Sequence, residues 1–455
     1  MTSDDTTMLD VFRDGAVRHP DRIALEELAA GGARRDARLT WREWHELSTR
    51  VARGLLRDGV RPGDAVAIFA GNRNLWPIGE LGILMAGAVS VGIEADSATP
   101  LLVEQLADCS AVAVIVDSTE RLAMLLAARG ELPALQLIVC EDGPSNGARW
   151  WGEWLGDTMA ADTPLPDAMP DDIALIAYRR GGGIPLGARI PHRCLLASAV
   201  AFRATLGLTE RDSALSVLPY ADMRERVFGL YTRILCGMPV GHVTAAHCLQ
   251  AAATTFEPTV VVVSPRCCET LHEALVAHES AGSVIAATWR SAIELGGERS
   301  ALRSRGASVP DLLEARWRVA SAPCRSAIAK LLGANIRVVV TAGPPLAAEV
   351  AEYLAAAGLT VLAAHGQAEH LCIAMQRPGG ADAGTAGPPM PGTEVRITAD
   401  GDLLVARNAL TFAGYLGRPD ATRDAFTSDG RWLMTGDRAE LLDDGRLRIT
   451  RSGEQ

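Results

Sequence analysis

The amino-acid sequence predicts an α/β fold, in which two doubly wound αβαβα subdomains precede a small β-rich subdomain. Two observations predict it: short apolar runs alternate with amphipathic stretches, and this alternation ends near residue 378. The runs are continuously apolar and rich in β-branched residues, which is typical of strands buried on both faces of a parallel sheet. Six such runs occupy residues 65–70, 111–116, 135–140, 259–264, 336–342 and 359–364.

Amphipathic stretches with helical spacing lie between these runs. Residues 41–59, WREWHELSTRVARGLLRDG, predict a helix that ends at a glycine, a common helix terminator. A further strand-like run, DIALIAY at 172–178, precedes the helical stretch HRCLLASAVAFRATL at 192–206. The loop between them, YRRGGGIPLGARIPH, contains three consecutive glycines. A glycine-rich turn between a strand and a helix is a common phosphate-binding arrangement, but this loop has no serine, threonine or lysine.

Two changes in composition predict the domain boundaries. The loop EDGPSNGARWW at 141–151 suggests a division near residue 145, so that 1–145 and 146–377 form the two α/β portions. From residue 378 to 455, glycine, proline and short alternating strands predominate, with turn signals at 400–402 and 443–445. This last part is therefore expected to be the β-rich subdomain.

The overall composition excludes several classes of protein. A net charge of −11 and a pI near 5.4 argue against a nucleic-acid partner and suit a cytoplasmic protein. The beginning of the chain shows no secretory signal. The most apolar stretch, 80–95, contains Glu80 and Glu94 and is too short for a membrane span. Nine irregularly spaced cysteines, including the adjacent Cys267 and Cys268, are expected to be reduced structural thiols.

The order of several motifs resembles the adenylate-forming (AMP-binding, ANL) superfamily, and in particular its long-chain acyl-CoA synthetases. The segments that carry the resemblance are NRNLWPIGELGILMAGAVSVGI (72–93), YRRGGGIPLGARIPH (178–192), SVLPYADMRERVFGLY (216–231), TAGPPLAAEV (341–350), HGQAEH (365–370), TAGPPMPGTEVRI (385–397), GYLGRPDATRDAF (414–426) and TGD (435–437). The resemblance covers nearly the whole chain. It implies the large N-terminal domain of an acyl-CoA synthetase.

Departures from the family pattern are concentrated at the positions that bind the nucleotide and carry out the reaction in the family. Leu186 stands where the family's phosphate loop has lysine, and the loop's hydroxyl positions hold arginine or glycine. His365 replaces the tyrosine that stacks on adenine, Ala368 the threonine that contacts a phosphate, and Asp222 the histidine of the L-P-x-A-H segment. The chain also stops where the family's hinge would begin, so the C-terminal lid domain with its catalytic lysine is expected to be absent. Lys330, the one lysine in the chain, is expected to be a surface residue.

Other family positions are retained. The resemblance implies that Gly343 contacts adenine, that Asp437 binds the ribose hydroxyls, and that Glu369 binds magnesium if a Mg-nucleotide binds. For the loop, it implies a backbone anion site at Arg180, Gly181, Gly182 and Gly183. The alternative for Arg179 and Arg180 is a solvated strand edge.

Adenylation needs several groups that neutralise a triphosphate, and removal of one such group typically costs about 10²–10³ in rate. Three or more are missing here, so the sequence predicts ATP-independent or altered chemistry on an acyl or acyl-thioester substrate. No cofactor is then required, and residual binding of ATP or AMP with Mg²⁺ is the remaining option. Two alternatives stay open. One is an acyl-adenylate or acyl-CoA ligase with atypical nucleotide ligands, helped by a separate C-terminal domain. The other is a non-catalytic protein that binds a synthase or a carrier protein.

The candidate catalytic residues are Asp222, His365 and Glu369. Asp222 and His365 together would form an acid–base pair in the pocket where acyl group and nucleotide meet in the family. The alternative for Asp222 is a salt bridge to Arg224 or Arg226. His365, Glu369 and His370 also offer metal-ligand chemistry, but their spacing matches no zinc motif. His192, at the end of the glycine loop, is expected to cap a helix or to be packed against its neighbours.

Overall fold

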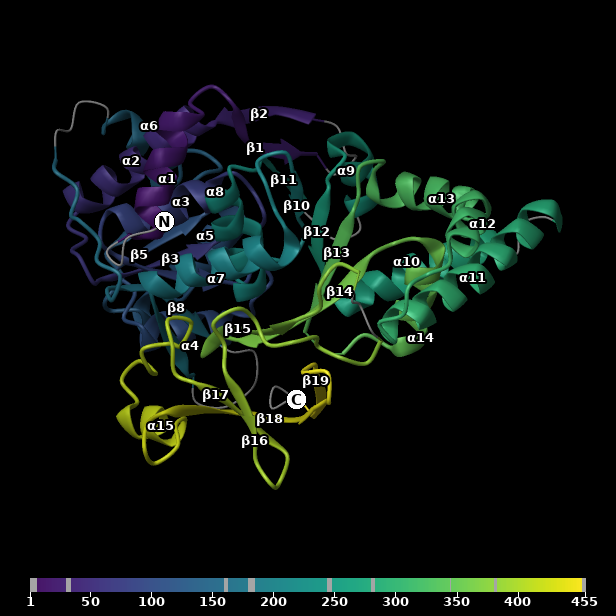
Figure 1. Cartoon of the computed structure of the whole chain (residues 1–455). Coiled ribbons are helices and arrows are strands. Elements are labelled where there is room, and N and C mark those ends of the chain that lie inside the picture. The colour runs from purple at the N-terminus through teal and green to yellow at the C-terminus, as the bar shows by residue number, and fades with distance from the viewer. Residues whose placement is uncertain are drawn as a thin grey trace.

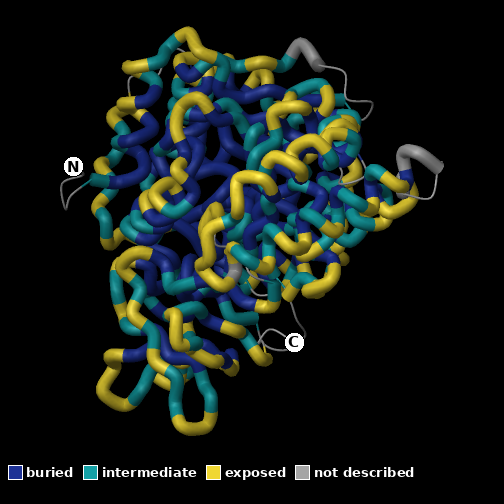
Figure 2. Tube along the Cα trace, turned by 45° about the vertical axis from the view of Figure 1, so that its right-hand side comes forward, coloured by how far each residue is buried: buried dark blue, intermediate teal, exposed yellow. Residues whose placement is uncertain are grey.

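Two large mixed sheets lie side by side, and a small antiparallel sheet lies against them at the C-terminal end of the chain (Figure 1). The computed structural model describes residues 6–29, 34–158, 163–178, 185–243, 248–279, 283–343, 345–379 and 383–451. Figure 2 shows that the buried parts of the chain lie inside the two larger layers, whereas the loops of the small sheet are exposed. This is the predicted architecture, and the fold class is confirmed.

The first sheet has the strand order β7-β6-β5-β3-β4-β8-β9. Its members are β3 (Ala65–Phe69), β4 (Val89–Ile93), β5 (Ala113–Val116), β6 (Leu137–Cys140), β7 (Arg149–Trp150), β8 (Ile173–Tyr178) and β9 (Gly187–Pro191). The helices that accompany it are α2 (Trp41–Arg57), α3 (Leu75–Met85), α4 (Thr99–Asp108), α5 (Thr119–Ala127), the 3₁₀-helix η1 (Arg129–Glu131) and α6 (Trp151–Gly156). All pairings are parallel except β8 with β9, so the apolar runs predicted as parallel strands are confirmed here.

The second sheet has the order β15-β14-β13-β12-β10-β11-β1-β2. Its strands are β1 (Ile23–Leu28), β2 (Arg34–Thr40), β10 (Ala214–Ser216), β11 (Val240–Val243), β12 (Val260–Val263), β13 (Val338–Ala342), β14 (Val361–Gln367) and β15 (His370–Met375). The remaining helices of the two α/β layers are α1 (Met8–Arg18), α7 (His192–Leu206), the π-helix η2 (Glu225–Tyr231), α8 (Thr232–Cys236), α9 (Leu249–Phe256), α10 (Pro265–Glu279), α11 (Ser283–Ser304), α12 (Asp311–Ala320), α13 (Ala322–Leu332) and α14 (Ala348–Ala357).

The small sheet is antiparallel throughout, in the order β16-β17-β18-β19. It comprises β16 (Val395–Ile397), β17 (Asp402–Ala406), β18 (Trp432–Leu441) and β19 (Leu447–Arg451), with α15 (Pro419–Asp424) before β18. The predicted turns at 400–402 and 443–445 lie between β16 and β17 and between β18 and β19.

Alternate residues of a central strand bury against different helices, which explains the continuous apolar runs. In β3, Val66 and Ile68 belong to a core that includes Leu55 of α2 and Leu81 of α3. Ala65, Ala67 and Phe69 of the same strand instead join a core with leucines of α4 and α5. Both faces of the strand therefore require apolar side chains. The same division occurs in β13, where Val338 and Val340 lie in one cluster and Val339 in another.

The two large sheets interleave along the chain. Strands β1 and β2 join the second sheet because β1 pairs in parallel with β11. Strands β8 and β9, which follow residue 145, belong to the first sheet through the β4–β8 pairing. The domain boundaries expected near residues 145 and 378 remain proposals. Within the described residues, no helix is long and apolar enough to cross a membrane.

Candidate functional site

The candidate site lies at the carboxyl ends of β13 and β14, where the small sheet meets the second sheet. The two strands are parallel, with Thr341 opposite Ala363 and Ala342 opposite Ala364. Gly343 and His365 follow these pairs directly, so both are at the same edge of the sheet. Ligands commonly bind at the carboxyl ends of strands in such sheets. Asp437 reaches this edge from β18 of the small sheet.

His365 and Asp437 form a hydrogen-bonded pair. The Nε2 atom of His365 lies 2.8 Å from Oδ2 of Asp437, and the exposed fractions of the two side chains are 14% and 2%. The backbone N–H of Asp437 donates to the hydroxyl of Thr435 at 3.1 Å, and that hydroxyl donates to the carbonyl of Leu403 at 2.8 Å. Strands β17 and β18 therefore fix the backbone from which the carboxylate extends. The partner of His365 differs from the one expected from the sequence, which was Asp222.

Asp222 is paired with Arg224 instead. Its carboxylate accepts hydrogen bonds from the backbone N–H of Arg224 at 2.9 Å and from Nε at 2.9 and 3.0 Å, and Nη2 also donates to it. The second terminal nitrogen of Arg224 donates to the carbonyl of Ala342 at 2.6 Å. The alternative interpretation of Asp222, a salt bridge to Arg224, is therefore the one that the structure shows. The expected acid–base pair of Asp222 with His365 is not formed, because each side chain is held by a nearer partner.

Gly343 has a conformation and surroundings that exclude a side chain. Its φ of +120° is rarely adopted by L-residues, and an added Cβ would contact Nη1 of Arg224. The absence of a side chain at Gly343 therefore allows the Arg224 guanidinium to reach the end of β13. In this way Asp222, Arg224 and Gly343 form one group of contacts beside the His365–Asp437 pair.

Glu369 lies between β14 and β15 and is 2% exposed. Its Oε1 accepts the hydroxyl of Tyr415 at 2.6 Å, and its backbone carbonyl accepts the N–H of Phe412. Next to it, His370 is fully buried, and burial lowers the pKa of its imidazole to about 4. Among the residues that the structure describes, no three His, Cys, Asp or Glu side chains gather as metal ligands.

The predicted anion site at Arg180, Gly181, Gly182 and Gly183 lies outside the described residues, as does Arg179. The flanking residues show that the loop joins two strands, because β8 and β9 pair antiparallel from Tyr178 to Gly187. The expected direct passage from strand to helix is therefore wrong, since β9 intervenes before α7. Leu186, at the family's lysine position, is partly buried against an apolar cluster that includes Phe412.

The base of this hairpin is tied to the small subdomain through Asp108. The hydroxyl of Tyr178 donates to Oδ2 of Asp108 at 2.8 Å, and Nη2 of Arg418 donates to Oδ1 at 2.9 Å. Asp108 thus joins α4, β8 and the segment before α15. Sequence reasoning did not identify this link, since nothing local marks an aspartate at the end of a helix as a three-way contact.

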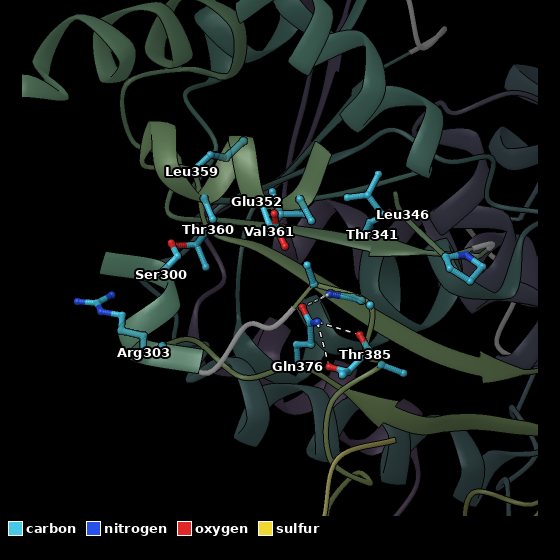
Figure 3. Close-up of a pocket in the computed structure, with 18 of the residues that line it drawn as sticks. Ser300, Arg303, Thr341, Leu346, Glu352, Leu359, Thr360, Val361, Gln376 and Thr385 are labelled. Carbon is cyan, nitrogen blue, oxygen red and sulfur yellow. Dashed lines mark hydrogen bonds between the residues drawn. The ribbon is translucent and has the colours of Figure 1, made fainter. Parts of the chain in front are cut away.

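A cavity of about 410 Å³ opens beside His365 and Gly343 (Figure 3). Figure 3 shows Ser300 and Arg303 of α11 on one side of it and Thr341 and Leu346 on the other. Its wall also includes Trp317, Glu352, Ala355, Leu359, Val361, Ala363, Ala364, Gln376, Thr385 and Ile449. Many of these side chains are small or apolar, which is typical of sites for small organic ligands. Asp222 and Glu369 are not part of this wall.

The α11 side of the cavity is the part that sequence reasoning missed. Arg299 lies 4.0 Å from the Trp317 ring centroid, and its Nε is 2.7 Å from Oε2 of Glu314. On the opposite wall, the side-chain amide of Gln376 donates to the carbonyl of Thr385 at 2.8 Å and accepts the N–H of Ala363 at 3.0 Å. These contacts hold the wall in place without motifs that a sequence could reveal.

Three further residues have the structural positions that were expected from the sequence. His192 is the first residue of α7 and is 2% exposed, and burial lowers its pKa to about 4. Lys330 is exposed near the end of α13. Cys268 is fully buried, which raises its thiol pKa to about 12, so it is not a reactive thiolate.

Comparisons with known proteins agree with this geometry. The family described as AMP-binding enzyme matches residues 12–416. The chain is 31% identical over 417 residues to the long-chain-fatty-acid–CoA ligase FadD15 of Mycobacterium bovis, covering 88% of this chain and 67% of that protein. It is 27% identical to the mouse long-chain-fatty-acid–CoA ligase 6, covering 98% of this chain and 67% of the relative.

Solved structures share the fold at low sequence identity. The anthranilate CoA ligase AuaEII in complex with anthranoyl-AMP has a TM-score of 0.79 at 20% identity, covering 99% of this chain and 79% of that one. The N-terminal domain of FACL13 from Mycobacterium tuberculosis has a TM-score of 0.76 at 20% identity, covering 98% of this chain and 100% of that one. From the match to residues 12–416 and the relatives over 30% identical, we conclude that the chain belongs to the AMP-binding enzyme family, in its long-chain fatty-acid CoA ligase-like branch.

Proposed function

We propose that this chain acts on an acyl or acyl-thioester substrate with His365 and Asp437 as an acid–base pair, and that it does not activate the acyl group with ATP in the family's usual way. The observation that carries the proposal is the 2.8 Å contact between Nε2 of His365 and Oδ2 of Asp437. The resemblance assigns Asp437 to the ribose hydroxyls. Here the same carboxylate is engaged by a side chain of the protein.

The energetics favour retention of this contact. Asp437 is almost completely buried, and a buried carboxylate is strongly destabilised when its partner is removed. A ribose would have to share or displace a hydrogen bond to a charged group, which is typically worth about 1.5–3 kcal/mol. That corresponds to a weakening of nucleotide affinity by about 10- to 150-fold. The nucleotide thus fits this arrangement less well than a ligand that leaves the pair intact.

The pair also has the arrangement of a general base. A carboxylate that accepts a hydrogen bond from one ring nitrogen sets the tautomer and orientation of an imidazole. With Nε2 donating to Asp437, Nδ1 of His365 is the nitrogen that accepts a proton. Because His365 lines the cavity, a water molecule attacking the carbonyl carbon of a thioester there would give its proton to this atom. The carbon–sulfur bond would then break, and the imidazole would return the proton to the thiolate that leaves. Glu369 and the Asp222–Arg224 pair then shape the surroundings of the site.

The relatives named as fatty-acid CoA ligases support the acyl part of the proposal. They also support the alternative, an acyl-adenylate or acyl-CoA ligase with atypical nucleotide ligands, in which Gly343 and Asp437 keep their family roles. That alternative requires ATP with Mg²⁺ and a C-terminal domain or carrier protein as partner. It predicts that the nucleotide displaces His365 from Asp437.

Two assays on the purified chain distinguish these functions. One measures pyrophosphate release with ATP, Mg²⁺ and a panel of carboxylic acids. The other measures thiol release or acyl transfer from acyl-pantetheine and acyl-CoA thioesters without ATP. We expect turnover only in the second assay, with kcat lowered by His365→Gln while KM changes little. Robust pyrophosphate release by the wild type would refute the proposal, and inactivity in both assays would favour a binding protein instead.

A further inference from the structure

A buried hydroxyl without a hydrogen-bond acceptor lies in the wall of the cavity beside His365. Thr341, in β13, is 4% exposed, and its Oγ1 atom makes no hydrogen bond to oxygen or nitrogen within the part of the chain that the structure describes. The thiol of Cys268 lies near it. Burial raises the pKa of that thiol to about 12, and the Thr341 hydroxyl opposes the rise only in part. Because a thiol is a weak hydrogen-bonding group, the hydroxyl keeps its capacity to donate to a ligand.

Other buried hydroxyls are satisfied or have a packing role. Among the described serine and threonine side chains, just Ser48 and Thr341 have a buried hydroxyl oxygen with no hydrogen-bond partner. Ser48 lies in α2, where Gly82 of α3 packs closely against it. The hydroxyl of Thr158, by contrast, donates to the carbonyl of Leu155 at 2.7 Å. Thr341 lines the cavity (Figure 3), so a ligand that accepts from its hydroxyl would remove the cost of leaving it unpaired.

The register of the second sheet places this hydroxyl on the same side as the general base. Thr341 is opposite Ala363 in the parallel pairing of β13 with β14, and His365 is two residues beyond Ala363. Side chains two residues apart on a strand point to the same face, so the three residues share one face of the sheet, and all three line the cavity. With strands about 4.8 Å apart and a rise of about 3.3 Å per residue, the Cα atoms of Thr341 and His365 are about 8 Å apart.

This separation suits a carbonyl group together with one water molecule. A carbonyl oxygen that accepts from the Thr341 hydroxyl would lie about 2.8 Å from Oγ1. The attacking water would lie about 3 Å from the carbonyl carbon, between that carbon and Nδ1 of His365. The side-chain amide of Gln376, on the same wall, is engaged with Thr385 and Ala363 and is therefore not available to the carbonyl.

We propose that the Thr341 hydroxyl donates a hydrogen bond to the carbonyl oxygen of the acyl-thioester substrate, an inference that rests on the function proposed for His365. When water attacks, a carbon–oxygen bond forms, a proton passes to Nδ1 of His365, and negative charge develops on the carbonyl oxygen. A donor held at that oxygen stabilises the charge. The carbon–sulfur bond then breaks, and the imidazole returns the proton to the thiolate. The products are the carboxylic acid and the free thiol.

The cavity also gives the acyl chain a direction and a length. Its wall follows β14 from His365 back to Val361, a distance of about 13 Å, and continues to Leu359 and Trp317. These last three side chains are apolar, as an acyl chain requires. At about 1.2 Å per bond, as in an extended peptide, an eight-carbon chain is about 9 Å long and fits beside β14. Octanoyl-pantetheine is therefore the probe for turnover.

The kinetic test compares the wild type with two variants of Thr341. Thr341→Val removes the hydroxyl at nearly constant volume, and Thr341→Ser retains it. We expect Thr341→Val to lower kcat for hydrolysis of octanoyl-pantetheine about 100-fold or more with little change in KM, and Thr341→Ser to keep most of the activity. Thr158→Val is the matched control, because it removes a buried hydroxyl that lies after α6, outside the site, and it should leave kcat unchanged.

Stability separates a substrate contact from a structural role. Thr341→Val loses no hydrogen bond to oxygen or nitrogen of the protein, so it should melt at or above the temperature of the wild type. Thr158→Val loses the bond to Leu155 and should melt below it. If Thr341→Val melts as far below the wild type as Thr158→Val does, the hydroxyl has a partner within the protein and the proposal is overturned.

Two analogues that cannot be hydrolysed test the contact itself. One is the ketone in which a methylene replaces the sulfur of octanoyl-pantetheine, and the other is octyl-pantetheine, a thioether that lacks the carbonyl. The preference for the ketone should be about five-fold larger in the wild type and Thr341→Ser than in Thr341→Val. An equal preference in all three proteins would overturn the proposal. The expected difference would support the contact even if the wild type left octanoyl-pantetheine intact, and the failure would then lie with the acid–base pair of His365 and Asp437.

Discussion

Replacement of Gly343 by alanine tests the contact network at the end of β13. Gly343 has a φ of +120°, and an added Cβ would strike the guanidinium of Arg224. That guanidinium donates to the carbonyl of Ala342 at 2.6 Å and is paired with Asp222. The substitution therefore imposes two separate penalties, one from the backbone conformation and one from displacement of Arg224.

The two penalties can be estimated separately. A non-glycine residue in a sparsely populated backbone region costs about 1–3 kcal/mol. Loss of the hydrogen bond from the charged Arg224 to Ala342 adds about 1.5–3 kcal/mol. Gly59 provides the control, since its φ is +97° and nothing lies within 4 Å of an added Cβ. Gly59→Ala should therefore show the conformational penalty alone.

Thermal unfolding of both variants measures the difference. At about 1 °C for each kcal/mol in a chain of 455 residues, Gly343→Ala should melt about 1.5–3 °C below Gly59→Ala. In a background that also carries Arg224→Ala, the guanidinium is gone and this gap should close. If the two glycine variants melt together, or if the gap persists without Arg224, the contact described at Gly343 is wrong.

Three further predictions concern other parts of the chain. Gly82→Ala should destabilise the fold by about 1–3 kcal/mol, because its Cβ would lie 2.8 Å from the carbonyl oxygen of Ser48 in α2. An unchanged midpoint of urea unfolding would contradict this close packing. Asp108→Asn should speed limited proteolysis between 178 and 187, because Asp108 holds Tyr178 and Arg418, whereas the exposed Asp420→Asn should leave the cleavage rate unchanged. Burial lowers the pKa of His370 to about 4 from 6.5, so the unfolded chain binds the proton first as pH falls. Relative to a His370→Leu variant, the wild type should lose about 2 kcal/mol of stability between pH 7.5 and pH 5. If the difference in unfolding free energy between the two proteins stays constant across this range, the imidazole is not buried in its neutral form.

Local patterns were sufficient for most of the fold. The run at 336–342 is apolar at every position from Val338 to Val340, because opposite faces of β13 bury against different helices. The helix expected at 41–59 is α2, whose N-cap Thr40 accepts the backbone N–H of Glu43. Strand β9 was missed because GARIP is short and ends in proline, so its strand conformation depends on pairing with β8. The pairing of β1 with β11 could not be predicted either, since it joins residues far apart in sequence.

The candidate site was only partly predictable for the same reason. His365 and Asp437 were both identified as site residues, but they are 72 residues apart, and their contact depends on how the small sheet lies against the second sheet. Asp222 is paired with Arg224, two residues away. The sequence suggested this salt bridge as one alternative but gave no ground for preferring it to the pair with His365. The cavity wall from α11 has no motif at all, because Ser300 and Arg303 reach it only through the packing of α11 against α14.

The central claim is that His365 is hydrogen-bonded to Asp437, the carboxylate that the resemblance assigns to the ribose hydroxyls. Calorimetric titration of ATP with Mg²⁺ into wild type and His365→Tyr tests it most directly, since the variant removes the contact of Nε2 with Asp437 and restores an aromatic ring. The account predicts that the wild type binds ATP about 10- to 150-fold more weakly than the variant. Equal and tight binding by both proteins would contradict it.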